Sequence, residues 1–75
     1  MKHFEVVIPN GGFPLRYRSN TIAETFCCLM AASERISNIT FDPDELLRDL
    51  VKMKDGWMMV LIKDDYSIYM TEGGA

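Results

Sequence analysis

The first 18 residues contain the pattern that most restricts the fold. Apolar side chains alternate with other residues on both sides of Pro9-Asn10-Gly11-Gly12, and a period of two residues is typical of strands with one buried face. Asn-Gly favours a two-residue turn in which both central residues have positive φ. The segment therefore predicts a β-hairpin centred on Asn10-Gly11, with Ile8 opposite Phe13. A turn at Gly11-Gly12 would shift every pairing by two residues and keep the same faces.

Two helices are predicted next. Thr21 and Glu24 form a capping box before the first helix. Asp42 is an N-cap for the second helix, Pro43 suits its first position, and Gly56 suits its C-terminal end. The apolar positions recur at helical spacing, and the residues expected on the two buried stripes are Ile22, Phe26, Leu29, Met30 and Ile36, then Leu46, Leu47, Leu50, Val51 and Met53.

Residues 57–62 and 66–71 predict a second hairpin. With Asp64-Asp65 as its loop, Leu61 faces Ile68 and Val60 faces Tyr69. The whole chain, residues 1–75, is then a single α+β domain of order ββααββ. It is a four-stranded antiparallel sheet with a two-helix hairpin packed on one face. Strand orders 1-2-3-4 and 2-1-4-3 both remain open, because Pro14 favours an edge for the second strand and the all-apolar third strand favours the centre.

The charge and the apolar runs limit the surroundings of the chain. Eleven acidic residues against eight basic ones give a net charge of −3, which disfavours non-specific binding to nucleic acid or to anionic membranes. The longest apolar run, residues 57–62, is too short to cross a bilayer, so no membrane partner is expected. The opening MKHFEVV lacks the apolar segment of a secretory signal. We expect a cytoplasmic protein.

The side chains with reactive groups do not form a site in the sequence. Cys27 and Cys28 are neighbours on the first helix and point apart, so they cannot share one metal ion or form a disulfide easily. We expect Cys27 at the edge of the core and Cys28 turned away from the sheet. The carboxylates crowd the start of the second helix, where they complement its dipole. No metal, no cofactor and no enzymatic activity are therefore predicted.

Two surfaces are candidates for binding. The third strand is apolar on both faces, and Trp57, Met59 and Leu61 are expected to face the helices. The opposite face has no second layer to cover it, and exposed apolar patches mark interfaces. The residues predicted to contact a partner there are Met58, Val60, Ile62 and Tyr69. On the same outer face, the residues that could contact an anion or a nucleic acid are His3, Arg16 and Arg18.

The C-terminal residues Thr71-Glu72-Gly73-Gly74-Ala75 resemble the diglycine tail of ubiquitin-like and sulfur-carrier proteins. Those proteins are also small and begin with a hairpin, and the resemblance implies a carrier that uses a terminal glycine carboxylate. Two consecutive helices and a tight final hairpin depart from the single main crossover helix of that family, and Ala75 would first have to be removed.

The predicted function is that of a small non-catalytic binding protein. It would act through protein contacts and regulate or inhibit a larger partner, in the manner of small phage- or mobile-element-encoded inhibitors of host machinery. That comparison is associative, because it follows from size and acidity. Homodimerisation through the open sheet face is compatible with this function. The alternative is a nucleic-acid-binding module that uses the same face.

Overall fold

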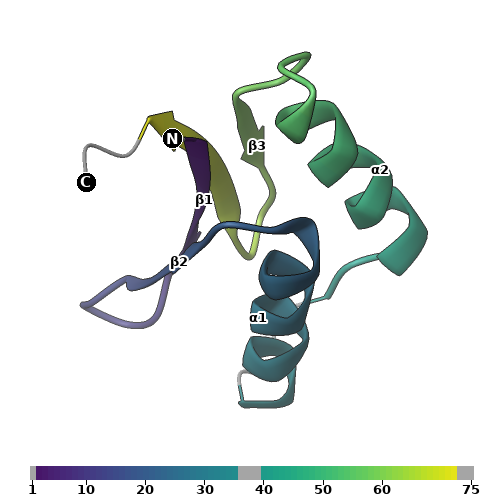
Figure 1. Cartoon of the computed structure of the whole chain (residues 1–75). Helices are drawn as coiled ribbons and strands as arrows, with labels where there is room; N and C mark the ends of the chain where they lie inside the picture. Colours follow the sequence, from purple (N-terminus) through teal and green to yellow (C-terminus); the bar gives the residue numbers. More distant parts are fainter. Residues whose placement is uncertain (1, 36–39, 73–75) are drawn as a thin grey trace.

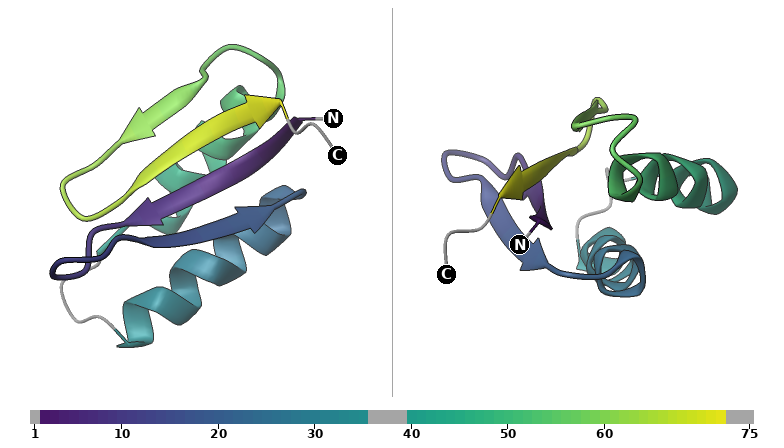
Figure 2. Two further views of the ribbon diagram at one scale, coloured as in Figure 1. Left: turned by 90° about the vertical axis from the view of Figure 1, so that its left-hand side faces the viewer. Right: turned by 45° about the horizontal axis from the view of Figure 1, so that its top comes forward.

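The computed structural model describes residues 2–35 and 40–72. One antiparallel four-stranded sheet lies against two helices (Figure 1). In chain order the elements are β1 (Lys2–Ile8), β2 (Leu15–Ser19), α1 (Ile22–Arg35), α2 (Pro43–Lys54), β3 (Val60–Ile62) and β4 (Ser67–Glu72). Both helices lie behind the sheet in the left view of Figure 2, and no helix covers its front. The predicted α+β architecture is confirmed.

The strand order is β2-β1-β4-β3. β2 lies at an edge, as Pro14 favoured, because proline cannot donate a hydrogen bond to a neighbouring strand. The order is thus the second of the two left open, and β3 forms the other edge although its apolar sequence favoured the centre. A two-residue loop keeps β4 beside β3, and β1 pairs with the remaining side of β4 from Lys2 opposite Glu72 to Val7 opposite Ser67.

The first hairpin has the register in which the turn is centred on Gly11-Gly12. Ile8 lies opposite Leu15, and the Phe13 amide donates to the Asn10 carbonyl at 3.1 Å, so the turn is centred on Gly11-Gly12. The prediction of a turn centred on Asn10-Gly11 is wrong. Gly11 has φ +61°, and Gly12 lies outside the left-handed region. Positive φ at only the first central residue is the requirement of a type II′ turn, in which that residue is glycine.

The second hairpin has the predicted register. Val60 lies opposite Tyr69 and Leu61 opposite Ile68. The Lys63 amide donates to the Tyr66 carbonyl at 2.9 Å, which closes the loop around the two aspartates.

α2 begins and ends at the predicted signals. The Asp42 side chain accepts hydrogen bonds from the amides of Asp44 at 3.0 Å and Glu45 at 3.5 Å, and Pro43 occupies the first turn. At the other end Gly56 has φ +86°, and its amide donates to Met53. Local sequence alone therefore fixes the length of this helix.

The core lies between the sheet and the helices. It consists of Phe4, Val6, Ile8, Leu29, Ala32, Leu46, Leu50, Met53, Leu61, Tyr66, Ile68 and Met70. Phe4, Val6 and Ile8 are inward positions of β1, so Glu5 and Val7 face the opposite side of the sheet.

Both helices are rotated relative to the predicted stripes. α1 buries Thr25, Leu29 and Ala32, and Met30 is exposed. The Thr25 hydroxyl hydrogen-bonds the Ser19 hydroxyl at 2.5 Å in a buried position, so this side of the helix faces the end of β2. In α2, Leu47 and Val51 are exposed because they lie about 100° from the buried Leu46 and Leu50. The predicted core position Ile36 lies outside the described residues.

Candidate binding surface

The outer face of the sheet brings residues of all four strands into cross-strand rows. One row runs from β2 to β3 through Arg18, Glu5, Tyr69 and Val60. The next row runs in the same order through Arg16, Val7, Ser67 and Ile62. Because cross-strand neighbours lie about 5 Å apart, the eight side chains form one continuous surface. We call it the outer face.

The chemistry of the outer face changes from one edge of the sheet to the other. At the β2 edge, the Arg16 guanidinium pairs with the Glu5 carboxylate at 2.9 Å, diagonally across the strands, and Arg18 is exposed beside it. At the β3 edge the side chains are apolar: Tyr69 is 36%, Val60 42% and Ile62 72% exposed. The outer face is therefore apolar at the β3 edge and charged at the β2 edge, where Arg16 is paired with Glu5 and Arg18 is exposed.

The free edge of β3 adds directional contacts to the apolar side. The Met70 amide donates to the Met59 carbonyl at 2.8 Å, and the Lys63 amide donates to the Tyr66 carbonyl at 2.9 Å. In an antiparallel pair such hydrogen-bonded positions alternate with positions whose N–H and C=O point away from the partner strand. Val60 and Ile62 are those alternate positions, so their backbone groups point to the free edge.

Two expectations for the third strand are corrected. β3 begins at Val60, and Met58, which precedes it, packs against the core and is half-buried. Met58 is therefore not part of the outer face, whereas Val60, Ile62 and Tyr69 lie there as predicted. Trp57 and Met59 were expected to face the helices together with Leu61, but both are exposed, whereas Leu61 is buried as expected. Exposed apolar side chains are therefore also present in the segment that precedes β3.

The proposed anion-binding residues are only partly brought together. Arg16 and Arg18 share the β2 edge of the outer face. His3 is 6% exposed, and its Nε2 lies 2.6 Å from the Thr71 hydroxyl, so its ring is occupied within the protein. Its buried Nδ1 has no hydrogen-bond partner in the described structure. Gly73 to Ala75, on which the carrier resemblance depends, lie outside the described residues.

The cysteines are placed the other way round from the prediction. Cys27 is exposed and Cys28 is half-buried, as the rotation of α1 requires. Burial raises the pKa of the Cys28 thiol, and the neighbouring Cys27 and Glu24 add to this increase. A raised pKa reduces the thiolate fraction, which is the reactive form. Within residues 2–35 and 40–72, no group of three or more His, Cys, Asp or Glu side chains is arranged to hold a metal ion.

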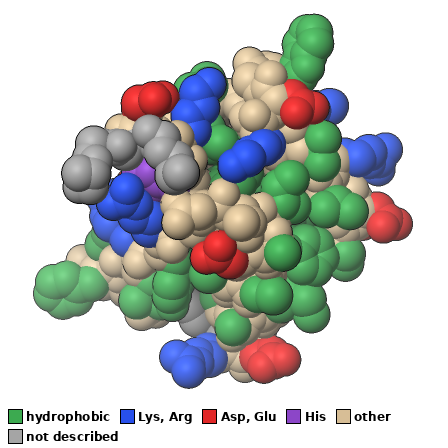
Figure 3. Space-filling view, in the orientation of Figure 1, with side chains coloured by type: hydrophobic (Ala, Val, Ile, Leu, Met, Phe, Trp, Pro, Cys, Tyr) green, Lys and Arg blue, Asp and Glu red, His purple; other side chains and the backbone are tan. Residues whose placement is uncertain are grey.

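Sequence reasoning missed a second apolar surface, on the helices. We call Met30 of α1 with Leu47 and Val51 of α2 the helix ridge; each is more than 40% exposed. Phe26, one turn before Met30, packs edge-on against Phe41 at 5.9 Å, so this flank of α1 faces α2. Figure 3 shows hydrophobic side chains gathered over the two helices. The sequence signal was an apolar stripe wider than one sheet contact can bury.

Comparison with protein-family models, with curated proteins and with solved structures finds no match for this chain. Among the described helices, none is long and apolar enough to span a membrane.

Proposed function

We propose that this protein is a small non-catalytic binding protein that regulates or inhibits a larger cytoplasmic protein by binding it through the outer face. The observation that supports the proposal is the exposed apolar set Val60, Ile62 and Tyr69 on a sheet face that neither described helix covers. Exposed apolar patches of this kind mark interaction sites in soluble proteins. The free cysteines agree with a reducing compartment.

The charge distribution favours a different protein over a second copy of this chain. Two copies could pack with their outer faces together. If the two-fold axis runs across the strands, Arg16 and Arg18 of one copy lie over Arg16 and Arg18 of the other. If the axis runs along the strands, the arginines of one copy lie over the apolar residues at the β3 edge of the other. Both arrangements lose electrostatic complementarity. A partner with carboxylates beside an apolar patch satisfies both sides of the outer face.

The partner must also extend past the β3 edge. Four strands about 4.8 Å apart give a face roughly 20 Å wide, whereas a standard interface covers about 800 Å² on each partner. The backbone N–H and C=O groups of Val60 and Ile62 point to that edge, where a strand of a partner can pair with them. We therefore place the free edge of β3 within the contact area.

Site-specific photocrosslinking in the native cells tests the proposal. Benzoylphenylalanine replaces Ile62 on the outer face in one variant and Leu47 on the helix ridge in the matched control. We expect a crosslinked adduct of defined mass from position 62 and none from position 47. Arg18→Gln should reduce the yield at position 62.

Three results would overturn the proposal. An adduct from position 47 alone would move the partner to the helix ridge. An adduct with twice the mass of the chain would replace the different partner by a second copy. No protein adduct from position 62, with binding of nucleic acid that Arg16→Ala and Arg18→Ala abolish, would favour the nucleic-acid-binding alternative.

A further inference from the structure

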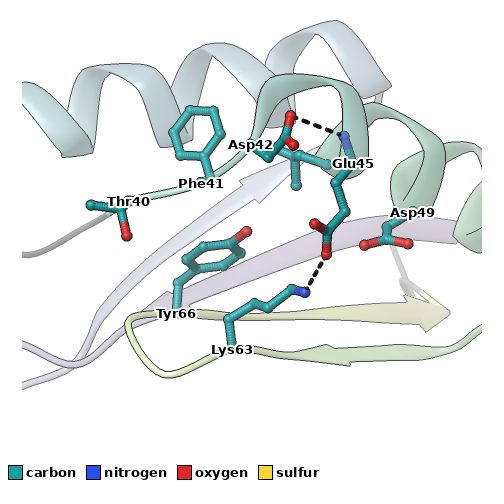
Figure 4. Close-up of a pocket in the computed structure, with 8 residues that line it drawn as sticks. Thr40, Phe41, Asp42, Glu45, Asp49, Lys63 and Tyr66 are labelled. Atoms are coloured by element: carbon teal, nitrogen blue, oxygen red, sulfur yellow. Dashed lines mark hydrogen bonds and ion pairs between the residues drawn. The ribbon is translucent and has the colours of Figure 1, made fainter.

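A pocket of about 360 Å³ opens between the start of α2 and the loop that joins β3 to β4. Figure 4 shows Phe41 and Tyr66 on one side of it and Glu45, Asp49 and Lys63 on the other. Leu46 completes the apolar wall. The volume is at the lower end of the range for small-ligand sites, about 300–1,000 Å³.

Tyr66 contributes a polar atom that has no hydrogen-bond partner among residues 2–35 and 40–72. The residue is 3% exposed, and Figure 4 shows its hydroxyl pointing into the pocket between Phe41 and Glu45. The hydroxyl makes no hydrogen bond within the described part of the chain. Burial raises the pKa of this phenol, with Asp49 among the further causes, so it is neutral at physiological pH. The ring is buried while the hydroxyl oxygen remains accessible from the pocket, so the hydroxyl is open to a ligand.

The carboxylates of the pocket differ in how they are used. Asp42 caps α2, and Glu45 pairs with the Lys63 ammonium at 2.8 Å. Asp49 is half-buried, and in residues 2–35 and 40–72 it forms no hydrogen bond or ion pair. Three carboxylates against one ammonium give the lining a net charge of −2. The pocket therefore favours a cation, and Asp49 is the carboxylate available to it.

We propose that this pocket binds a guanidinium group. A guanidinium is planar, so it can lie against the faces of Phe41 and Tyr66, and it carries several N–H donors for the Asp49 carboxylate and the Tyr66 oxygen. An ammonium lacks the flat surface for the two rings. The group can come from an arginine side chain of a protein or from a free small guanidine. The inference does not depend on a partner at the outer face.

Amide chemical-shift titration of the full chain with methylguanidinium tests the inference. We expect saturable shifts at Phe41, Asp49 and Tyr66. Methylurea, which has the same shape without the charge, and methylammonium, which lacks the flat surface, should bind at least about tenfold more weakly, because hydrogen bonds to charged groups are the stronger ones. Asp49→Asn and Tyr66→Phe preserve side-chain shape and should each weaken methylguanidinium binding by about fivefold to tenfold.

Asp64→Asn is the matched control, because this exposed carboxylate does not line the pocket and its change should leave binding unaltered. Equal shifts with methylurea or methylammonium, or unchanged binding in a folded Asp49→Asn variant, would overturn the inference. A second titration separates the two sources. Tighter binding of a capped arginine peptide than of agmatine supports a protein side chain, and the reverse supports a free small guanidine.

Discussion

The outer face and the helix ridge each expose three large apolar side chains to a similar extent. They differ in what surrounds those side chains. On the outer face, Val60 and Ile62 also turn backbone N–H and C=O groups to a free edge, and two arginines lie on the far side of the same sheet. On the ridge, the backbone groups are used within the helices. Equal apolar exposure therefore gives unequal capacity for directional binding, and the outer face is the better interface.

The largest expected effect is a difference in unfolding free energy between substitutions at two neighbouring residues of α2. Leu50 is fully buried and Val51 lies on the helix ridge. Leu50→Ala should lower the free energy of unfolding by about 2–5 kcal/mol because it leaves a cavity, whereas Val51→Ala should cost less than about 0.5 kcal/mol. Urea denaturation measures both. Equal costs would mean that the ridge is packed and would end the comparison.

The buried side of α1 contains a polar contact that the ridge lacks. Thr25→Val removes the hydrogen bond to Ser19 and leaves the Ser19 hydroxyl unpaired in the interior, which should cost about 1–3 kcal/mol of unfolding free energy. Thr25→Ser keeps the hydroxyl and serves as the control in the same denaturation experiment. If Thr25→Val were as stable as the native chain, the Ser19 contact would not stabilise the fold.

Polar substitutions on the two apolar surfaces should scarcely change stability. Ile62→Thr keeps a β-branched side chain in β3, and Leu47→Gln keeps a good helix former in α2. Each should change the unfolding free energy by less than about 0.5 kcal/mol because both positions are exposed. Thermal unfolding followed by circular dichroism checks this. A large loss at either position would identify that surface as core.

The smallest expected effect is chemical and compares the two cysteines. Iodoacetamide should modify Cys27 before Cys28, because Cys27 is more exposed and burial raises the pKa of Cys28. Below its raised pKa, Cys28 has a smaller thiolate fraction than an ordinary thiol, so its modification should keep accelerating to a higher pH. Peptide mapping by mass spectrometry at several pH values gives both rates. Faster modification of Cys28 would contradict the rotation assigned to α1.

Most features encoded by neighbouring residues could be predicted from the sequence, and most features set by contacts between elements could not. The turn of the first hairpin is an exception, because Asn10-Gly11 and Gly11-Gly12 both suit a two-residue turn. Asp42 and Gly56 mark the ends of α2 because their roles depend on backbone within a few residues. The side of α1 that is buried faces Ser19, which lies in β2. The candidate outer face followed from alternation in β3 and β4, except that Met58 lies before the strand begins.

The strand order and the pocket depend on contacts between residues that are far apart in the sequence. The strand order follows from the pairing of β1 with β4, whose residues are far apart in the chain. The pocket joins Phe41 and Asp49 to Lys63 and Tyr66, and no local spacing reports that these four residues meet. Patterns of period two or 3.6 describe one element at a time, so they do not reveal such combinations.

The pairing of β1 with β4 has a consequence for synthesis of the protein. β1 leaves the ribosome first, but its second neighbour in the sheet, residues 67–72, is made only after both helices and β3. Until then one long side of β1 has no strand beside it, and Phe4, Val6 and Ile8 have only part of their cover. The sheet therefore cannot close before residues 67–72 have been made, and until then the unpaired side of β1 is a strand edge at which another chain could pair.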